Sequence, residues 1–259
     1  MVKGLYTAYT GMINEQNRMD IMTNNLANAS TVGYKKEGST SQSFDDVLTV
    51  KIKDQSVGMR NVQRLGVKNP GVKIGENYTD YSQGSFRITG NTYDLALSGE
   101  GFFAIEFTNK AGETDTKYTR AGQFTLNKDG YLVTEEGDYV LDTQNRRIRL
   151  NTLIDSSITD DGTIYQNGQA VAKIQVTDFE EYDYLEKYGE TYYQPIQGAK
   201  TIAAKAQVKS GYLEMANVQI VSEMVNLISI TRAYESNQKV VQTIDDTLDV
   251  AVNQIGRVQ

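Results

Sequence analysis

Carboxylate pairs are the first candidates for catalytic chemistry in this chain. Acidic residues are adjacent at Asp45–Asp46, Asp160–Asp161, Glu180–Glu181 and Asp245–Asp246. Two carboxyl groups with different pKa values are sufficient to hydrolyse a glycosidic bond, and this reaction requires no imidazole. Adjacent side chains do not face each other, however, and these pairs by themselves define no cleft. A peptidoglycan-cleaving carboxylate enzyme therefore stays open only as an alternative.

Composition excludes the other common classes of active site. The 259 residues include neither cysteine nor histidine. Thiol chemistry, Ser–His–Asp catalysis and histidine-ligated zinc or haem are therefore impossible. Acidic residues outnumber basic ones by 33 to 26, which argues against nucleic acid because phosphate binding depends on clustered Lys and Arg. We expect no cofactor, no metal and no catalytic residue, and the absence of a long apolar run predicts no membrane insertion.

Two short motifs resemble ligand-binding loops without the elements that such loops need. The run Gly99–Ala104 fits the GxGxxA pattern of dinucleotide sites, but strand-forming residues follow it where a helix is required. The run Thr125–Glu136 has the spacing of a calcium loop, but it begins with Thr and has no flanking helical pattern. Both runs are predicted to connect strands.

Helical periodicity occurs at the two ends of the chain. Leu5, Met12, Met19 and Leu26 recur every seven residues and predict an N-terminal helix that ends in an Asn-rich turn near Gly33. A second stripe with this spacing runs through Leu213, Ile220, Leu227, Tyr234, Val241, Leu248 and Ile255. Each stripe is narrow, so we predict that the two helices form a coiled-coil-like inner domain with each other, with other copies, or with both. A long helix lying on its own globular domain stays open.

The middle of the chain has the pattern of a β domain. Short alternating segments such as Ser85–Thr89 and Gln123–Leu126 are separated by turn signals such as Lys128–Gly130. Residues 34–74 are polar and weakly periodic, which indicates an extended connector or hairpin. The predicted fold class is α+β, with three parts: residues 1–33 plus 211–259 as a discontinuous helical inner domain, 34–74 as the connector region, and 75–210 as a β-rich outer domain.

Four groups of motifs in a fixed order resemble those of bacterial flagellar rod and hook proteins. They are Asn24–Asn28 with Thr31–Lys35, then Gln83–Phe86 with Asp94–Ala96 and Gly99–Phe103, then Tyr118–Phe124 with Gly130–Val133, and finally Gly211–Glu214, Asn217–Val218 and Arg232–Asn237. The length and the Gly–Phe–Phe centre are similar to basal-body rod proteins of the distal and proximal types. Thr92–Tyr93 and Ala216 depart from the usual Pro–Leu and Ser of the family, which leaves the rod type open.

The resemblance implies a structural subunit of the flagellar basal-body rod that performs no catalysis. Such a subunit polymerises into a tubular drive shaft and transmits torque from the motor to the hook. The implied partners are other copies of the chain, other flagellar rod and hook proteins, and the flagellar export apparatus, which would export the chain to the cell envelope without a cleavable signal peptide. A non-flagellar coiled-coil or adhesin-like interaction module is the second alternative.

Two sets of residues are expected to carry this function. The stripe residues of both helices are expected to pack the inner helices and to make polymer contacts. Asn28, Thr31, Gly33 and Tyr34 are expected to form the joint between helix and outer domain, with Gly33 supplying a positive φ. A plain helix cap is the alternative for this turn, and a linker without partners is the alternative for residues 34–74.

Overall fold

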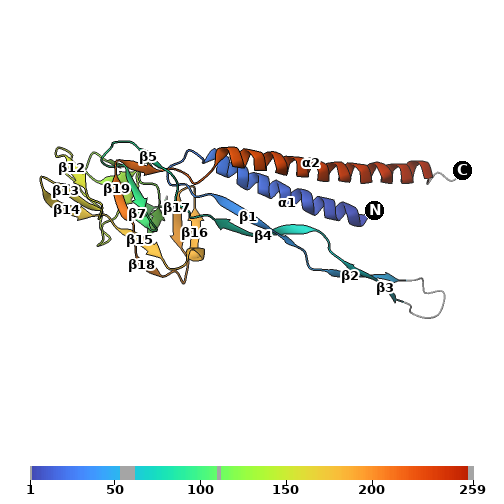
Figure 1. Cartoon of the computed structure of the whole chain (residues 1–259). Helices are drawn as coiled ribbons and strands as arrows, with labels where there is room; N and C mark the ends of the chain where they lie inside the picture. Colours follow the sequence, from blue (N-terminus) through green and yellow to red (C-terminus); the bar gives the residue numbers. More distant parts are fainter. Residues whose placement is uncertain (1, 53–61, 110–111, 256–259) are drawn as a thin grey trace. The chain divides into compact units, whose positions relative to one another are not determined.

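The computed structural model describes residues 2–52, 62–109 and 112–255. The chain divides into two compact units (Figure 1). The helical unit comprises residues 1–26, 37–80 and 220–259, and the β unit comprises residues 27–36 and 81–219. The division into inner domain, connector and outer domain stays a prediction.

The helical unit contains two long helices and two pairs of strands. Its elements are α1 (Val2–Ala27), β1 (Glu37–Ser43), β2 (Val47–Ile52), β3 (Val62–Lys68), β4 (Val72–Thr79), α2 (Ile220–Val250) and a terminal π-helical turn, η2 (Ala251–Ile255). Strand β1 pairs with β4, and β2 pairs with β3, both in antiparallel register. Residues 53–61 of the predicted connector lie outside the described residues.

The helices α1 and α2 lie side by side and antiparallel (Figure 1). A Cβ atom added to Gly4 would lie 3.6 Å from Cδ1 of Ile244, and one added to Gly11 would lie 3.1 Å from Nδ2 of Asn237. Because the earlier residue of α1 lies beside the later residue of α2, the two helices run in opposite directions. Glycine at these two positions leaves room for larger side chains of α2.

A second face of α1 packs against the strand pair β1–β4. The amide of Asn14 donates to Oγ of Ser41 over 3.1 Å. The side chain of Asn25 both donates to and accepts from the backbone of Glu37, over 2.7 and 2.9 Å. These contacts give α1 two different neighbours, one helix and one hairpin.

The predicted coiled-coil-like inner domain is wrong, although the α+β class agrees with the structure. The buried residues of α2 are Glu223 and Ile230, and those in the described part of α1 are Ala8, Asn14 and Asn25. None belongs to the seven-residue stripes, and most of them are polar. A coiled coil requires two apolar positions per heptad buried along both helices. Because α1 divides its contacts between α2 and the hairpin, no such continuous seam forms among the described residues.

The C-terminal helix is also shorter than its periodicity predicted. It begins at Ile220, whereas the preceding residues form strand β20 (Tyr212–Glu214), which pairs with β5 (Phe86–Ile88). Leu213 is buried in this strand and is not part of the helix. The seven-residue phase continues into the strand because spacing alone does not distinguish one apolar strand residue from a helical one. No helix within the described residues is long and apolar enough to cross a membrane.

The β unit is built from short antiparallel strands. Besides β5 and β20 it contains β6 (Leu95–Ser98), β7 (Phe102–Thr108), β8 (Thr114–Thr119), β9 (Phe124–Leu126), β10 (Leu132–Thr134), β11 (Tyr139–Val140), β12 (Ser156–Ile158), β13 (Thr163–Gln166), β14 (Gln169–Lys173), β15 (Val176–Phe179), the 3₁₀ turn η1 (Tyr182–Tyr184), β16 (Leu185–Tyr188), β17 (Tyr192–Pro195), β18 (Thr201–Ala203) and β19 (Gln207–Ser210). The main sheet has the order β16-β17-β8-β7-β11-β10-β9, and β15 pairs with both β7 and β18.

The core of the β unit lies on both sides of β7. Successive side chains of a strand point to opposite faces, so Phe102 and Phe103 enter different clusters. Phe103 makes an edge-to-face contact with Phe124, and Phe102 packs against Tyr193, with ring centres 5.2 and 5.4 Å apart. Strand β7 is therefore buried on both of its faces over residues 102–105.

Candidate functional site

The predicted joint is a tight turn within the β unit. The backbone N–H of Thr31 donates to the carbonyl of Asn28 over 3.1 Å, and the Thr31 hydroxyl donates to Oδ1 of the same residue over 3.1 Å. Gly33 adopts a φ of 71°, and a Cβ atom there would lie 2.3 Å from the backbone nitrogen of Ala121. A side chain at Gly33 thus meets both an unfavourable backbone conformation and a clash with the backbone. The ring of Tyr34 is buried, with Nζ of Lys187 4.2 Å from its centre.

A fully buried carboxylate holds this turn in place. Glu214 is 0% exposed and accepts from Nζ of Lys35 over 2.6 Å and from a guanidinium nitrogen of Arg120 over 3.3 Å. The same carboxylate accepts from the backbone N–H of Gly84 over 3.0 Å, while the carbonyl of Glu214 accepts from the N–H of Gly33 over 2.8 Å. One residue of β20 therefore binds three other segments of the β unit.

Asparagine extends the network around Glu214. Oδ1 of Asn217 accepts from the backbone N–H of Lys36 over 2.7 Å, and its Nδ2 donates to the carbonyl of Ser82 over 3.2 Å. Nζ of Lys35 donates to that same carbonyl over 2.8 Å. Two cations and one carboxylate are buried together here, and a buried ion pair of this kind is strongly destabilised when one partner is removed.

Lys35, Arg120, Glu214 and Asn217 were not among the predicted site residues. Each of them nevertheless lies within one of the motifs on which the family resemblance rests. Charged residues inside otherwise apolar or glycine-rich motifs were the signal that could have identified the network. Their pairing could not be predicted, because the sequence does not show that Lys35 and Glu214, which are 179 positions apart, are in contact.

The predicted stripe residues differ in burial, and they do not all lie in helices. Leu213 is buried in β20, and Ile220 is exposed at the start of α2. The remaining stripe residues with described side chains are half-buried on the two helices: Leu5, Met12, Met19, Leu26, Leu227, Tyr234, Val241 and Leu248. The side chain of Ile255 lies outside the described residues. Their role in polymer contacts stays a prediction.

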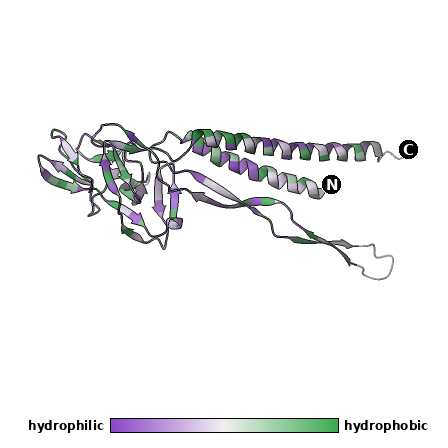
Figure 2. Cartoon of the chain, viewed as in Figure 1, coloured by the Kyte–Doolittle hydropathy of each residue, from purple (hydrophilic) through white to green (hydrophobic). Residues whose placement is uncertain are grey.

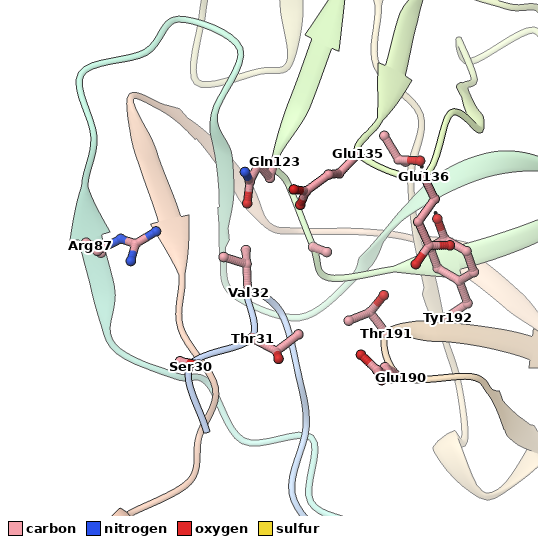
Figure 3. Close-up of a pocket in the computed structure, with 12 residues that line it drawn as sticks. Ser30, Thr31, Val32, Arg87, Gln123, Glu135, Glu136, Glu190, Thr191 and Tyr192 are labelled. Atoms are coloured by element: carbon pink, nitrogen blue, oxygen red, sulfur yellow. Dashed lines mark hydrogen bonds between the residues drawn. The ribbon is translucent and has the colours of Figure 1, made fainter. Parts of the chain in front are cut away.

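A hollow of about 420 Å³ lies beside the turn (Figure 3). Figure 3 shows Arg87 on one side and Glu136 and Tyr192 on the other, with Thr31 between them. None of the four acidic pairs considered in the sequence analysis lines this hollow, but another adjacent pair, Glu135–Glu136, does. The Tyr192 hydroxyl donates to Asp138 over 2.9 Å, and burial raises the pKa of this phenol above its ordinary value. The described residues contain no group of three metal-ligating side chains.

Comparison with known families matches three parts of the chain. Residues 5–35 match the family model described as "Flagella basal body rod protein". Residues 96–168 match "Flagellar hook protein FlgE/F/G D1 domain", and residues 209–255 match "Flagellar basal body rod FlgEFG protein C-terminal". The first and third matches cover the helices together with parts of the buried network, and the second covers the centre of the β unit.

Full-length relatives agree with these matches. The chain is 34% identical to the flagellar basal-body rod protein FlgG of Bacillus subtilis, over 98% of this chain and 99% of the relative. It is 31% identical to the flagellar basal-body rod protein FlgF of Caulobacter vibrioides, over 100% of both chains. It is 30% identical to the flagellar hook-basal body complex protein FlhO of Bacillus subtilis, again over 100% of both. The chain therefore belongs to the family of flagellar basal-body rod proteins, which are structural proteins and not enzymes.

Proposed function

We propose that this chain is a structural subunit of the flagellar basal-body rod, which polymerises with copies of itself and transmits torque from motor to hook. The names of its relatives support a location in the basal body and assembly with other rod and hook proteins. The observation that carries the proposal of polymerisation is the apolar surface that the helical unit leaves exposed. A protein that stays monomeric rarely exposes such a surface.

One part of this surface is a face of α2. Val221, Met224, Val225 and Ile228 are exposed, Val221 to 77% and Val225 to 61%. Their spacing of three and four residues places them on the same side of the helix. Figure 2 shows the apolar colouring at the beginning of α2. A neighbouring copy that covers this face removes it from water, at about 25 cal/mol per Å² of apolar area.

Similar surfaces occur on α1 and on the strand pair β2–β3. Tyr6, Tyr9 and Ile13 are exposed on one side of α1. Leu48 and Val67 are cross-strand partners in β2–β3, and both are exposed. An isolated two-stranded ribbon is at best marginally stable in water. We therefore extend the proposal to residues 34–74, which would select the neighbours of the subunit, and to the half-buried stripe residues that border the exposed helical faces.

The joint and the export route complete the proposal. The turn with Asn28, Thr31, Gly33 and Tyr34 connects α1 to the β unit and would act as the joint between inner and outer parts of the rod. Helix α1 contributes the buried residues Ala8, Asn14 and Asn25 to its unit. Loss of this helix would therefore leave the unit incomplete, so the proposal includes export by the flagellar apparatus with α1 retained.

The test of polymerisation uses two neighbouring positions on α2. Val225→Asp places a charge on the exposed apolar face, whereas Asn226→Asp places the same charge on an adjacent exposed polar residue. Both variants should keep the circular dichroism of the parent chain, because surface substitutions usually change stability by about 0.5 kcal/mol or less. We expect Val225→Asp to abolish sedimentable polymers of the purified chain and rod assembly in cells, and Asn226→Asp to retain both. Normal rods from Val225→Asp would overturn the proposed contact.

A further inference from the structure

Three of the four places where the chain passes between the units lie beside one group of hydrogen bonds. The chain leaves or enters the β unit after residues 26, 36, 80 and 219. Lys36 is the last residue before the second passage, and Ser82 is the second residue after the third passage. Asn217 lies two residues before the end of the β unit. These residues are far apart in sequence but are directly bonded within the β unit.

The side chain of Asn217 joins these three segments. It accepts from the backbone N–H of Lys36 over 2.7 Å and donates to the carbonyl and the hydroxyl oxygen of Ser82 over 3.2 and 3.0 Å. Lys35 reaches the same carbonyl of Ser82 over 2.8 Å. Each segment is thus bonded directly to the other two.

Glu214 connects this group to the sheet. Its carboxylate binds Lys35 and also Arg120, which follows strand β8 directly. All three charged side chains are buried, at 0 to 3% exposure. Separation of these groups would leave a buried charge without its partner, which is costly. The bonded group is therefore a stiff part of the β unit.

We propose that Asn217, Lys35 and Glu214 are positioning residues that clamp the three segments at fixed spacing where they leave the β unit. A single segment has two soft dihedral angles per residue, so it bends and twists easily under load. Segments that are bonded to one another cannot slide independently, and a torque applied to one unit is passed to the other through all of them together. This inference rests on the proposed role of the chain in a rod that carries torque.

The experiment measures the spread of distances between the units in the full chain. The chain contains no cysteine, so Thr152→Cys in the β unit and Gln238→Cys on α2 provide two exposed positions for spin labels. Double electron–electron resonance is recorded for the labelled parent, for Asn217→Ala and for Asn127→Ala. Asn127 is the matched control, because its side-chain oxygen, like that of Asn217, accepts from the backbone within the β unit. Its donors are the N–H groups of Asp129 and Tyr131, at a hairpin turn away from the passages.

Asn217→Ala is expected to broaden the distance distribution, and Asn127→Ala is expected to leave its width unchanged while losing similar thermal stability. Faster hydrogen exchange of the Lys36 amide in Asn217→Ala should accompany the broadening. A distribution for Asn217→Ala as narrow as that of the parent would overturn the clamp and leave a purely structural role. Broadening together with a parent chain that never assembles into rods would keep the clamp and refute the proposed function.

Discussion

Replacement of Glu214 by Gln tests the buried network most directly. The carboxylate of Glu214 is 0% exposed and faces two cations, Lys35 at 2.6 Å and Arg120 at 3.3 Å. Glutamine preserves the shape but removes the charge, and its amide group presents a donor to one of the cations. Loss of one partner from a buried ion pair costs about 3–5 kcal/mol. We expect Glu214→Gln to lose at least that lower value of unfolding free energy.

The assay is urea unfolding followed by far-UV circular dichroism and tyrosine fluorescence. With an m value of about 2–3 kcal/mol per M, a loss of about 3–5 kcal/mol corresponds to a midpoint lower by about 1–2.5 M. Glu180→Gln is the control, because its partner Lys200 and Glu180 itself are 78% and 58% exposed. Exposed pairs contribute about 0–1 kcal/mol, so this control should hardly move the midpoint.

A second variant separates the effect of charge from that of shape. If the loss arises from uncompensated positive charge, Lys35→Met in the Glu214→Gln background should restore part of the stability, since the two residues are coupled. The reasoning is refuted if Glu214→Gln behaves like Glu180→Gln. It is also refuted if Lys35→Met lowers stability further in the Glu214→Gln background.

Other expectations follow from the turn, from one carboxylate and from one phenol. Gly33→Ala should destabilise the chain by more than Gly189→Ala in thermal unfolding. Both glycines have a φ of 71°, but of the two only Gly33 has backbone atoms where the added Cβ would lie. Equal losses of stability would show that the clash at Gly33 is relieved. The hydrogen bond from Arg147 holds the pKa of Glu106 below its ordinary value of 4.5. This pair therefore stabilises the fold above pH 4.5 and loses its contribution as the pH falls further. Arg147→Gln should weaken the fall of the unfolding free energy at acid pH, and an unchanged fall would contradict the assignment. Burial raises the pKa of Tyr192, so Tyr192→Phe should leave the native tyrosine absorbance titration unchanged near pH 10; loss of an ionising phenol there would count against it.

The local parts of this protein follow from the sequence. Apolar residues at helical spacing predicted α1, and the Asn-rich turn with Gly33 predicted a change of direction because glycine reaches a positive φ without strain. Alternating residues between short turn signals predicted a β-rich middle. The ordered motifs indicated the family, and relatives over nearly the full length confirm it. The helix, the turn and the short strands each depend on neighbours within a few positions along the chain.

Long-range contacts decided the rest. A seven-residue period predicted a coiled coil, but the strand pair β1–β4 occupies a second face of α1. Polar Asn14 and Asn25 are therefore buried in place of an apolar seam. The same period ran through Leu213, which the pairing of β20 with β5 places in a sheet. Glu214 acquires its partners only when distant segments of the β unit meet around it. A sequence shows which groups are charged or apolar. The burial that makes the Glu214 carboxylate important for stability arises only when the chain has folded.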